Sequence, residues 1–350
     1  MNHLAIFIIS LGLSLLFTPL AVRVAIGANW FDRPGRHKIH QRKVPYFGGT
    51  AIVLATLCCL LVTRLVWSDI LSNLDIRLWS IIAGGLILYA VGIYDDLRTA
   101  SVWLRLAVQC LAGIILVMGG FCIKGIPSLV AGTIQLGVLS VPFTVLWTMF
   151  LINAINFIDG LDGLACGIAL IASLALFAAA LRIGEGFIAF LAVMTVGVMA
   201  GFLPYNFHPA RIFMGDSGST FVGFLLAAMT TLGTMKSVAA ISLLLPIAAL
   251  GVPIADTLSS IVRRTWKGQM FYRADKEHVH HMLLSIGFSH RGAVLFLYGV
   301  TLFLSLVANL LVLADRRVLA LLVILFLALT GIFYRKWRER DQPGGGPAGP

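Results

Sequence analysis

Long apolar segments alternate with short polar stretches along almost the whole chain. Each segment approaches the roughly 20 apolar residues that an α-helix needs to cross the hydrocarbon core of a bilayer. The pattern predicts an all-α fold, a polytopic integral membrane helical bundle with about eleven transmembrane helices. The expected helices span residues 3–24, 47–67, 79–94, 103–122, 138–156, 163–182, 187–203, 220–235, 237–258, 292–313 and 317–334.

The apolar segments extend to residue 334, and residues 1–334 are expected to form a single transmembrane domain. Pro246 and Pro253 should bend the ninth helix, where neighbouring helices can satisfy the freed carbonyl groups. The first span has no Lys or Arg before it and no small-residue cleavage site after it, which favours a retained helix over a signal peptide. Residues 335–350 are Pro- and Gly-rich at their end and are expected to form a disordered cytoplasmic tail.

Composition excludes a soluble enzyme. Hydrophobic residues make up 59% of the chain, charged residues 12%, and the mean hydropathy is +0.96. A soluble domain needs about 25% charged residues to cover its surface, so this chain is neither a soluble nor a disordered protein. The five cysteines fall inside or at the ends of apolar segments, and we interpret them as packing residues, not as zinc ligands or disulfides.

The distribution of basic residues predicts the orientation of the bundle. Segments on one side of the predicted helices carry 17 of the 26 Lys and Arg residues. Because cytoplasmic loops are enriched in these residues, the N-terminus is expected outside and the C-terminus inside. The polar clusters and seven of the eight histidines share that inner side, where chemistry is therefore expected. The net charge of +11 then indicates contact with membrane lipids or an anionic substrate, and no nucleic-acid partner.

Two polar clusters offer carboxylates. Asp95 and Asp96 follow an apolar helix directly in YDDLR, and adjacent carboxylates repel one another unless a cation or protons lie between them. A solvated helix end explains this pair equally well. In NAINFIDGLDGLA, four polar side chains recur every three residues and would share one helix face. Burying them beside hydrocarbon is costly unless they bind a ligand, and a capping role explains only one of them. These four are Asn153, Asn156, Asp159 and Asp162.

A third cluster, RIFMGDSGST, places Asp216 just before the eighth predicted helix. Ser217 and Ser219 could cap that helix, which is the structural alternative. A hard cation such as Mg²⁺ takes oxygen ligands from one or two protein groups and from phosphates. Asp216 together with one of the Asn or Asp residues of the second cluster fits that requirement.

The fourth cluster, EHVHH, holds His278, His280 and His281 within a basic loop. Its spacing lacks the i, i+4 pairing of a helical zinc site, so a phosphate site is favoured, with a solvated basic loop as the competing interpretation.

In the first inner loop, Lys43 is the best candidate for a substrate contact. Carboxylates and amides for a metal ion, with His, Lys and Arg for phosphate, suit phosphoryl transfer. The chain has no Walker loop, so ATP hydrolysis has no support.

In chain order, YDDLR, NAINFIDGLDGLA, IFMGDSGS and HVHH resemble the motifs of the polyprenyl-phosphate N-acetylhexosamine-1-phosphate transferases, glycosyltransferase family 4. The resemblance covers nearly the whole chain except the tail. It implies a helical bundle in the bacterial plasma membrane with its active site at the cytoplasmic face. The implied reaction moves a sugar 1-phosphate from a UDP-sugar to undecaprenyl phosphate or another polyprenyl phosphate, releases UMP, and requires Mg²⁺, with Mn²⁺ as an alternative.

The resemblance also implies roles for single residues. Asn156 and Asp216 would bind the metal ion that bridges the nucleotide pyrophosphate. Asp95 and Asp96 would lie at the lipid phosphate, with Asp95 activating it. The remaining implied roles are Asp159 as a catalytic residue near the nucleotide, Asp162 near the uracil, Asn153 as a substrate contact, and His278, His280 and His281 as neutralisers of phosphate charge.

Two departures favour one branch of the family. Thr99 stands where the muramoyl-pentapeptide branch usually has lysine, and that branch has three consecutive histidines where this chain has His-Val-His-His. Both features resemble the N-acetylglucosamine-1-phosphate branch, which starts O-antigen, enterobacterial common antigen or teichoic acid synthesis. UDP-N-acetylglucosamine is therefore the expected donor; UDP-MurNAc-pentapeptide and other UDP-N-acetylhexosamines are the alternatives.

Two other classes of protein are alternatives to the transferase. A transporter for an anionic lipid or nucleotide sugar could use the same carboxylates and basic loops, although transport favours polar groups near the membrane midplane. A polyprenyl-diphosphate phosphatase is the second alternative. The residues leave undecided whether transfer is direct or passes through a phospho-aspartate, how long the lipid chain is, and whether the protein is a homodimer.

Overall fold

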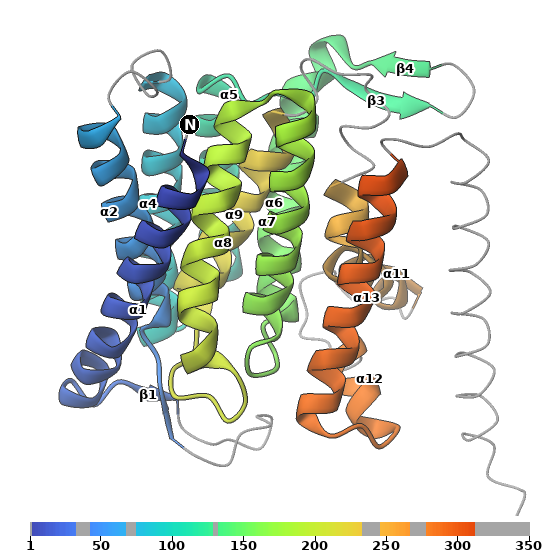
Figure 1. Cartoon of the computed structure of the whole chain (residues 1–350). Coiled ribbons are helices and arrows are strands. Elements are labelled where there is room, and N and C mark those ends of the chain that lie inside the picture. Colours follow the sequence, from blue (N-terminus) through green and yellow to red (C-terminus); the bar gives the residue numbers. More distant parts are fainter. Residues whose placement is uncertain are drawn as a thin grey trace, which may run out of the picture.

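The computed structural model describes residues 2–32, 43–67, 75–128, 132–232, 246–266 and 278–311. These residues form a bundle of long helices that run side by side, with the N-terminus at one end and the short helix α12 at the other (Figure 1). The helices are α1 (His3–Gly27), α2 (Gly48–Val66), α4 (Asp75–Leu97), α5 (Val102–Met118), α6 (Ser140–Ile158), α7 (Leu164–Ile183), α8 (Gly186–Asn206), α9 (Gly215–Leu232), α11 (Gly251–Trp266), α12 (Val279–Ser285) and α13 (His290–Leu311).

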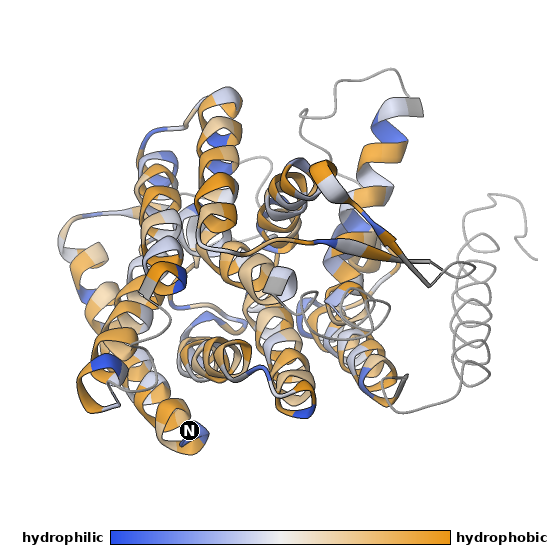
Figure 2. Cartoon of the chain, turned by 90° about the horizontal axis from the view of Figure 1, so that it is seen from above, coloured by the Kyte–Doolittle hydropathy of each residue, from blue (hydrophilic) through white to orange (hydrophobic). Residues whose placement is uncertain are grey.

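Most of the helices have the length and the apolar surface of membrane-spanning helices. Within the described residues, seven are long and apolar enough to cross a membrane, namely α1, α2, α4, α6, α7, α8 and α13, and α5 is a shorter apolar helix. Viewed along the bundle, apolar residues surround most of its circumference (Figure 2). Large side chains such as Leu4, Trp79 and Leu146 are exposed on that surface. The prediction of an all-α, multi-pass membrane protein is confirmed.

Two short antiparallel hairpins add to the helices. Strands β1 (Phe31–Asp32) and β2 (Val44–Pro45) follow α1, while β3 (Gly125–Ser128) and β4 (Gly132–Gln135) precede a single 3₁₀ turn (Gly137–Leu139) and α6. The sequence pattern predicted loops at both places. The first hairpin anchors the chain beneath α9, because Phe213 N donates to Pro45 O and Gly48 N donates to Phe213 O, both at 3.0 Å.

The ninth predicted helix differs most from expectation. Helical backbone at residues 246–249 is interrupted at Leu250, between the two prolines expected to cause a bend, and α11 begins at Gly251. The helix then runs to Trp266, so the predicted end at residue 258 is wrong. Its buried stripe at four-residue spacing is partly polar (Val252, Asp256, Ser260 and Arg264), a pattern that hydropathy alone does not recognise. The eleventh predicted span and the tail lie outside the described residues.

Glycines bring α2, α4 and α9 into backbone contact. A Cβ atom at Gly92 of α4 would overlap the Cα and N atoms of Ser217, and one at Gly49 of α2 would overlap the Ser217 side chain. Backbones that approach this closely need residues without side chains. The first turn of α9 is therefore fixed between two neighbouring helices.

Replacing Gly92 by Ala should displace the start of α9. We expect a loss of about 1–3 kcal/mol in stability, the usual cost of overpacking, and a fall in the thermal unfolding temperature of the detergent-purified protein. The matched control is Gly12→Ala in α1, where an added Cβ has no atom within 4 Å and the higher helix propensity of Ala should leave stability unchanged or raised. Equal unfolding temperatures for the two variants would contradict this account of the α4–α9 contact.

Candidate active site at one end of the bundle

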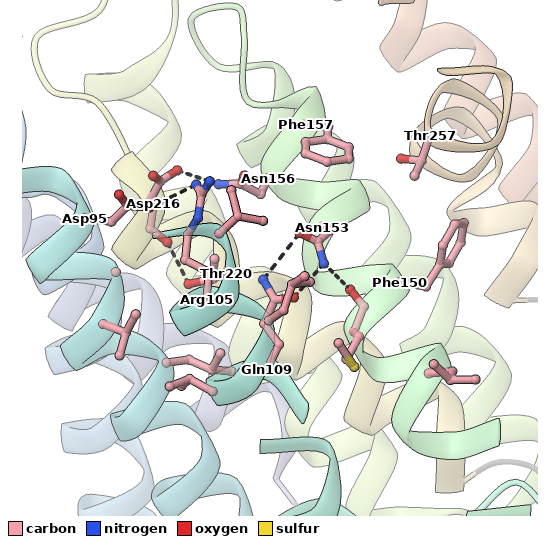
Figure 3. Close-up of a pocket in the computed structure, with 18 of the residues that line it drawn as sticks. Asp95, Arg105, Gln109, Phe150, Asn153, Asn156, Phe157, Asp216, Thr220 and Thr257 are labelled. Atoms are coloured by element: carbon pink, nitrogen blue, oxygen red, sulfur yellow. Dashed lines mark hydrogen bonds and ion pairs between the residues drawn. The ribbon is translucent and has the colours of Figure 1, made fainter. Parts of the chain in front are cut away.

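The polar motifs come together at the end of the bundle opposite the N-terminus, where α4 and α6 end and α9 begins. There, a pocket of about 420 Å³ lies between α4, α5, α6, α9 and α11. Four residues predicted from the sequence line it: Asp95, Asn153, Asn156 and Asp216 (Figure 3). Lys43, the predicted substrate contact, is exposed beside β2 and is not among the lining residues.

Asp96 caps α9 instead of facing the pocket. Its Oδ1 accepts a hydrogen bond from Asp216 N at 2.7 Å, and its Oδ2 accepts from Ser217 N at 3.2 Å and from Ser217 Oγ at 2.7 Å. The first N–H groups of a helix have no partner within the helix, and a carboxylate satisfies them with favourable charge. Asp96 of α4 therefore positions Asp216 and is not among the residues that line the pocket. Its place at the lipid phosphate stays a prediction.

Asp95 pairs with an arginine that the sequence pattern did not single out. Its Oδ2 lies 3.0 Å from Arg105 Nη1, and its Oδ1 accepts from Ala100 N at 2.6 Å. Both side chains line the pocket. An arginine in the first turns of an apolar helix, close in sequence to two carboxylates, was the signal that could have identified Arg105.

Asn156 and Asp216, 60 positions apart in the sequence, are in direct contact. Asn156 Nδ2 donates to Asp216 Oδ1 at 2.6 Å and to Ser219 Oγ at 2.9 Å. These two bonds use both amide hydrogens of Asn156. A further partner would therefore have to bind its carbonyl oxygen, which accepts hydrogen bonds or binds cations. The second and third motifs are thus in direct contact.

Asp159 completes an acidic cluster in the loop between α6 and α7. Desolvation, followed by the nearby carboxylates of Asp216, Asp96 and Asp162, raises the pKa of Asp159 well above its usual range. Several carboxylates that destabilise one another's charge, beside an amide oxygen, form the set of hard oxygen donors that a divalent cation prefers. The donor set at Asn156 and Asp216 fits Mg²⁺.

Asn153 forms a helix–helix contact on the pocket wall. Its Nδ2 donates to Gln109 Oε1 at 2.6 Å and to Met149 O at 2.7 Å, and Gln109 Nε2 donates back to Asn153 Oδ1 at 3.3 Å. This reciprocal amide pair joins α5 to α6. Both amide hydrogens of Asn153 are therefore engaged within the protein, while its side chain lines the pocket. Its contact to substrate stays a prediction.

Asp162 holds two loops and the start of α13 together. Its Oδ2 bonds to His208 Nδ1 at 2.8 Å and accepts from Ala210 N at 3.1 Å, while its own N–H donates to His290 Nε2 at 3.0 Å. The two imidazole rings stack with centroids 4.1 Å apart and planes 20° apart. One ligand atom of each of Asp162, His208 and His290 lies within 4.8 Å of the others, a spacing that could hold a metal ion. Their hydrogen bonds also brace the loop that carries Asp159.

The three motif histidines have different environments. His280 is buried against Gly160, where a Cβ atom would overlap the imidazole ring. Desolvation, and then the neighbouring His281, lowers the pKa of His280 to about 3. Burial thus disfavours the charged form of His280, and its role in neutralising phosphate charge stays a prediction. His278 bonds instead to Asp256 of α11.

Residues 78–234, which hold all the carboxylates described above except Asp256, match the family described as glycosyl transferase family 4. The chain is 36% identical over 325 residues to a probable undecaprenyl-phosphate N-acetylglucosaminyl 1-phosphate transferase of Bacillus subtilis, covering 92% of this chain and 88% of that protein. It is 38% identical over 295 residues to a decaprenyl-phosphate N-acetylglucosaminephosphotransferase of Mycolicibacterium smegmatis, covering 76% and 71%. It is also 28% identical over 348 residues to an undecaprenyl-phosphate alpha-N-acetylglucosaminyl 1-phosphate transferase of Yersinia pestis, covering 93% and 90%.

Proposed function

The chain belongs to glycosyl transferase family 4, and from this premise we propose that it transfers N-acetylglucosamine 1-phosphate from UDP-N-acetylglucosamine to a polyprenyl phosphate and releases UMP. One observation in the structure carries the proposal: an apolar pocket that ends at Asp95, Arg105, Asn156 and Asp216. Such a pocket joins a surface for a lipid chain to groups that bind a cation and a phosphate. The reaction would be the first membrane step of cell-envelope glycan synthesis.

The walls of the pocket support a lipid acceptor. Apolar side chains of α4, α5 and α6 line most of it, among them Leu88, Leu106 and Phe150, and its charged groups gather at one end. A polyprenyl chain would lie along the apolar walls, because contact with hydrocarbon there replaces contact with membrane lipid at little cost. Its phosphate would then reach Arg105, whose guanidinium suits phosphate oxygens.

The acidic cluster supports a metal-dependent reaction. Asp216 and the amide oxygen of Asn156 would hold Mg²⁺, or Mn²⁺ in its place. When bound, the ion neutralises charge on the donor pyrophosphate. Asp96 contributes indirectly, since it fixes the N–H groups of Asp216 and Ser217 and so keeps the Asp216 carboxylate in place.

In the reaction, an oxygen of the acceptor phosphate attacks the sugar-linked phosphorus of the donor. A new P–O bond forms, and the bond from that phosphorus to the bridging oxygen breaks, leaving its electron pair on UMP. Asp95 lies where the acceptor phosphate would arrive; we assign it to hold the proton of a phosphate monoester and to orient Arg105, to which it is bonded at 3.0 Å. Positioning and charge neutralisation supply most of the catalysis in such transfers.

The site is proposed to face the cytoplasm in the bacterial plasma membrane. The excess of Lys and Arg on one side of the predicted helices supports this orientation, and UDP-sugars are anionic substrates that a basic surface would attract.

The proposed function is tested by measuring UMP release from detergent-purified protein with UDP-N-acetylglucosamine, undecaprenyl phosphate and Mg²⁺. We expect release only when the lipid is present, which also indicates direct transfer. UMP release without acceptor, with label retained on the enzyme, would favour a phospho-aspartate route. Folded protein that releases no UMP from any UDP-sugar would contradict the proposal, and uptake of nucleotide sugar into proteoliposomes would then test the transporter alternative.

A further inference from the structure

Asp256 is a buried carboxylate on α11 that the four motifs do not include. It is 1% exposed. Its Oδ2 lies 2.8 Å from His278 Nδ1, and its Oδ1 accepts a hydrogen bond from Val279 N at 2.7 Å. Both oxygens are therefore engaged by the first two residues of the His-Val-His-His motif, one through a side chain and one through the backbone.

This arrangement determines where the His278 ring carries its hydrogen. An ionised carboxylate can only accept, so Nδ1 of His278 must donate to Asp256. The other ring nitrogen, Nε2, then lies on the opposite edge and is left for a different partner.

The His278 ring lies beside the pocket that we assign to the substrates. Its centroid is 5.8 Å from that of Phe157, which follows Asn156 and lines the pocket. Thr257, the neighbour of Asp256 in sequence, lines the same wall, and Figure 3 shows it with Phe157 on the side away from Asp95. The guanidinium of Arg264 lies 6.0 Å from the Phe157 centroid. His278 and Arg264 thus both lie close to Phe157, on the side of the pocket away from Asp95.

We propose that Asp256 is a positioning residue that holds His278 with hydrogen on Nδ1 and with Nε2 directed at a phosphate oxygen of the UDP-sugar. The inference rests on the proposed function, since it assigns the His278 partner to the donor pyrophosphate. The imidazolium donates a hydrogen bond to that oxygen and offsets the negative charge that grows on UMP as its P–O bond breaks. The same carboxylate docks α12 on α11 through Val279 N, so the ring and its backbone are fixed together.

Asp256→Asn separates this role from simple capping of α12. The Asn carbonyl oxygen can still accept from Val279 N, whereas its NH₂ group would face His278 Nδ1 and favour the tautomer with hydrogen on Nε2 in a neutral ring. We expect kcat for UMP release to fall about 10²-fold, the low end of what a preorganised donor to a developing negative charge contributes, while KM for UDP-N-acetylglucosamine changes by less than about threefold. A role limited to the cap predicts activity near that of the wild type and would overturn the proposal.

A double-mutant cycle tests whether Asp256 acts through His278. If it does, Asp256→Asn combined with His278→Gln should be no less active than His278→Gln alone, so the effects will not add. Additive losses would overturn the proposal. Ser259→Ala is the matched control on α11: its hydroxyl bonds to Asp256 O and to Arg263 but not to the His278 ring, and we expect kcat within about twofold of the wild type.

A spectroscopic measurement keeps the test independent of turnover. In protein labelled with ¹⁵N-histidine, the His278 signals are those that His278→Gln removes. We expect them to show a protonated Nδ1 in the wild type and an Nε2-protonated neutral ring in Asp256→Asn. Unchanged His278 signals in the variant would contradict the Asp256–His278 pair even if the wild type released no UMP, whereas the failure of UMP release alone would count against the proposed function only.

Discussion

Asp216→Asn is expected to abolish UMP release while the protein stays folded. We expect kcat/KM to fall at least about 10³-fold, which corresponds to roughly 4 kcal/mol of transition-state stabilisation. The substitution removes the negative charge that a divalent cation needs, yet the Asn oxygen can still accept the hydrogen bond that Asn156 Nδ2 donates at 2.6 Å. Removing one carboxylate from a mutually repelling group should also leave the thermal unfolding temperature unchanged or raised.

The measurement is a titration of UMP release with Mg²⁺, alongside thermal unfolding of the same preparation. Glu185→Gln is the control, because it makes the same change of charge between α7 and α8 at the opposite end of the bundle, away from the pocket, and should leave activity unchanged. Release by Asp216→Asn within about tenfold of the wild type would show that Asp216 is not a metal ligand.

The residues alone predicted that Asp216 would meet one of the Asn or Asp residues of the second cluster, and the family resemblance singled out Asn156. The first of these predictions had a local physical reason. Asn156 and Asp216 each lie at the inner end of an apolar segment, where burying an amide or a carboxylate is costly without a partner. Helices that share a membrane align their ends, so these two residues, 60 positions apart in the sequence, lie at the same depth in the bundle. Each can then serve as the polar partner of the other. The same reasoning predicted that the polar clusters would collect at one end of the bundle.

The residues alone could not separate Asp95 from Asp96, although the family resemblance gave the activating role to Asp95. The two residues have the same chemistry and lie in one motif, but successive residues on a helix point about 100° apart. One therefore faces Arg105 and the pocket, and the other faces the first turn of α9. Which residue takes which role depends on the rotation of α4 against its neighbours, and the packing of Gly84, Gly85 and Gly92 on α9 sets that rotation.

Other site residues were missed although signals for them existed. Asp256 is an isolated carboxylate within a predicted membrane segment, a placement that usually indicates function. Arg105 lies near the inner end of a predicted helix, where the general bias of basic residues already explains it. In both cases a general explanation accounted for the whole segment: hydropathy for the span that contains Asp256, and charge bias for the helix end that contains Arg105. The single functional residue was therefore not examined separately.

Asp95→Asn and Asp96→Asn, the same substitution at adjacent positions, should give different results. Asp95→Asn keeps an acceptor for Ala100 N but loses the ion pair with Arg105 and the group assigned to the acceptor phosphate. We expect UMP release to fall about 10³-fold with an unfolding temperature close to that of the wild type, because the Arg105 side chain is 38% exposed and water can replace its partner.

Asp96→Asn should instead destabilise the protein. An Asn oxygen can accept from Asp216 N, but the NH₂ group would then face the N–H and hydroxyl of Ser217, leaving buried donors without an acceptor. We expect a loss of about 1–3 kcal/mol in stability, together with a fall in activity as Asp216 moves. Thermal unfolding and UMP release measured on both variants separate the two roles. If Asp95→Asn lowered stability as much as Asp96→Asn, then Asp95 would also hold the helices together, and the assignment of the acceptor phosphate to Asp95 would lose its support.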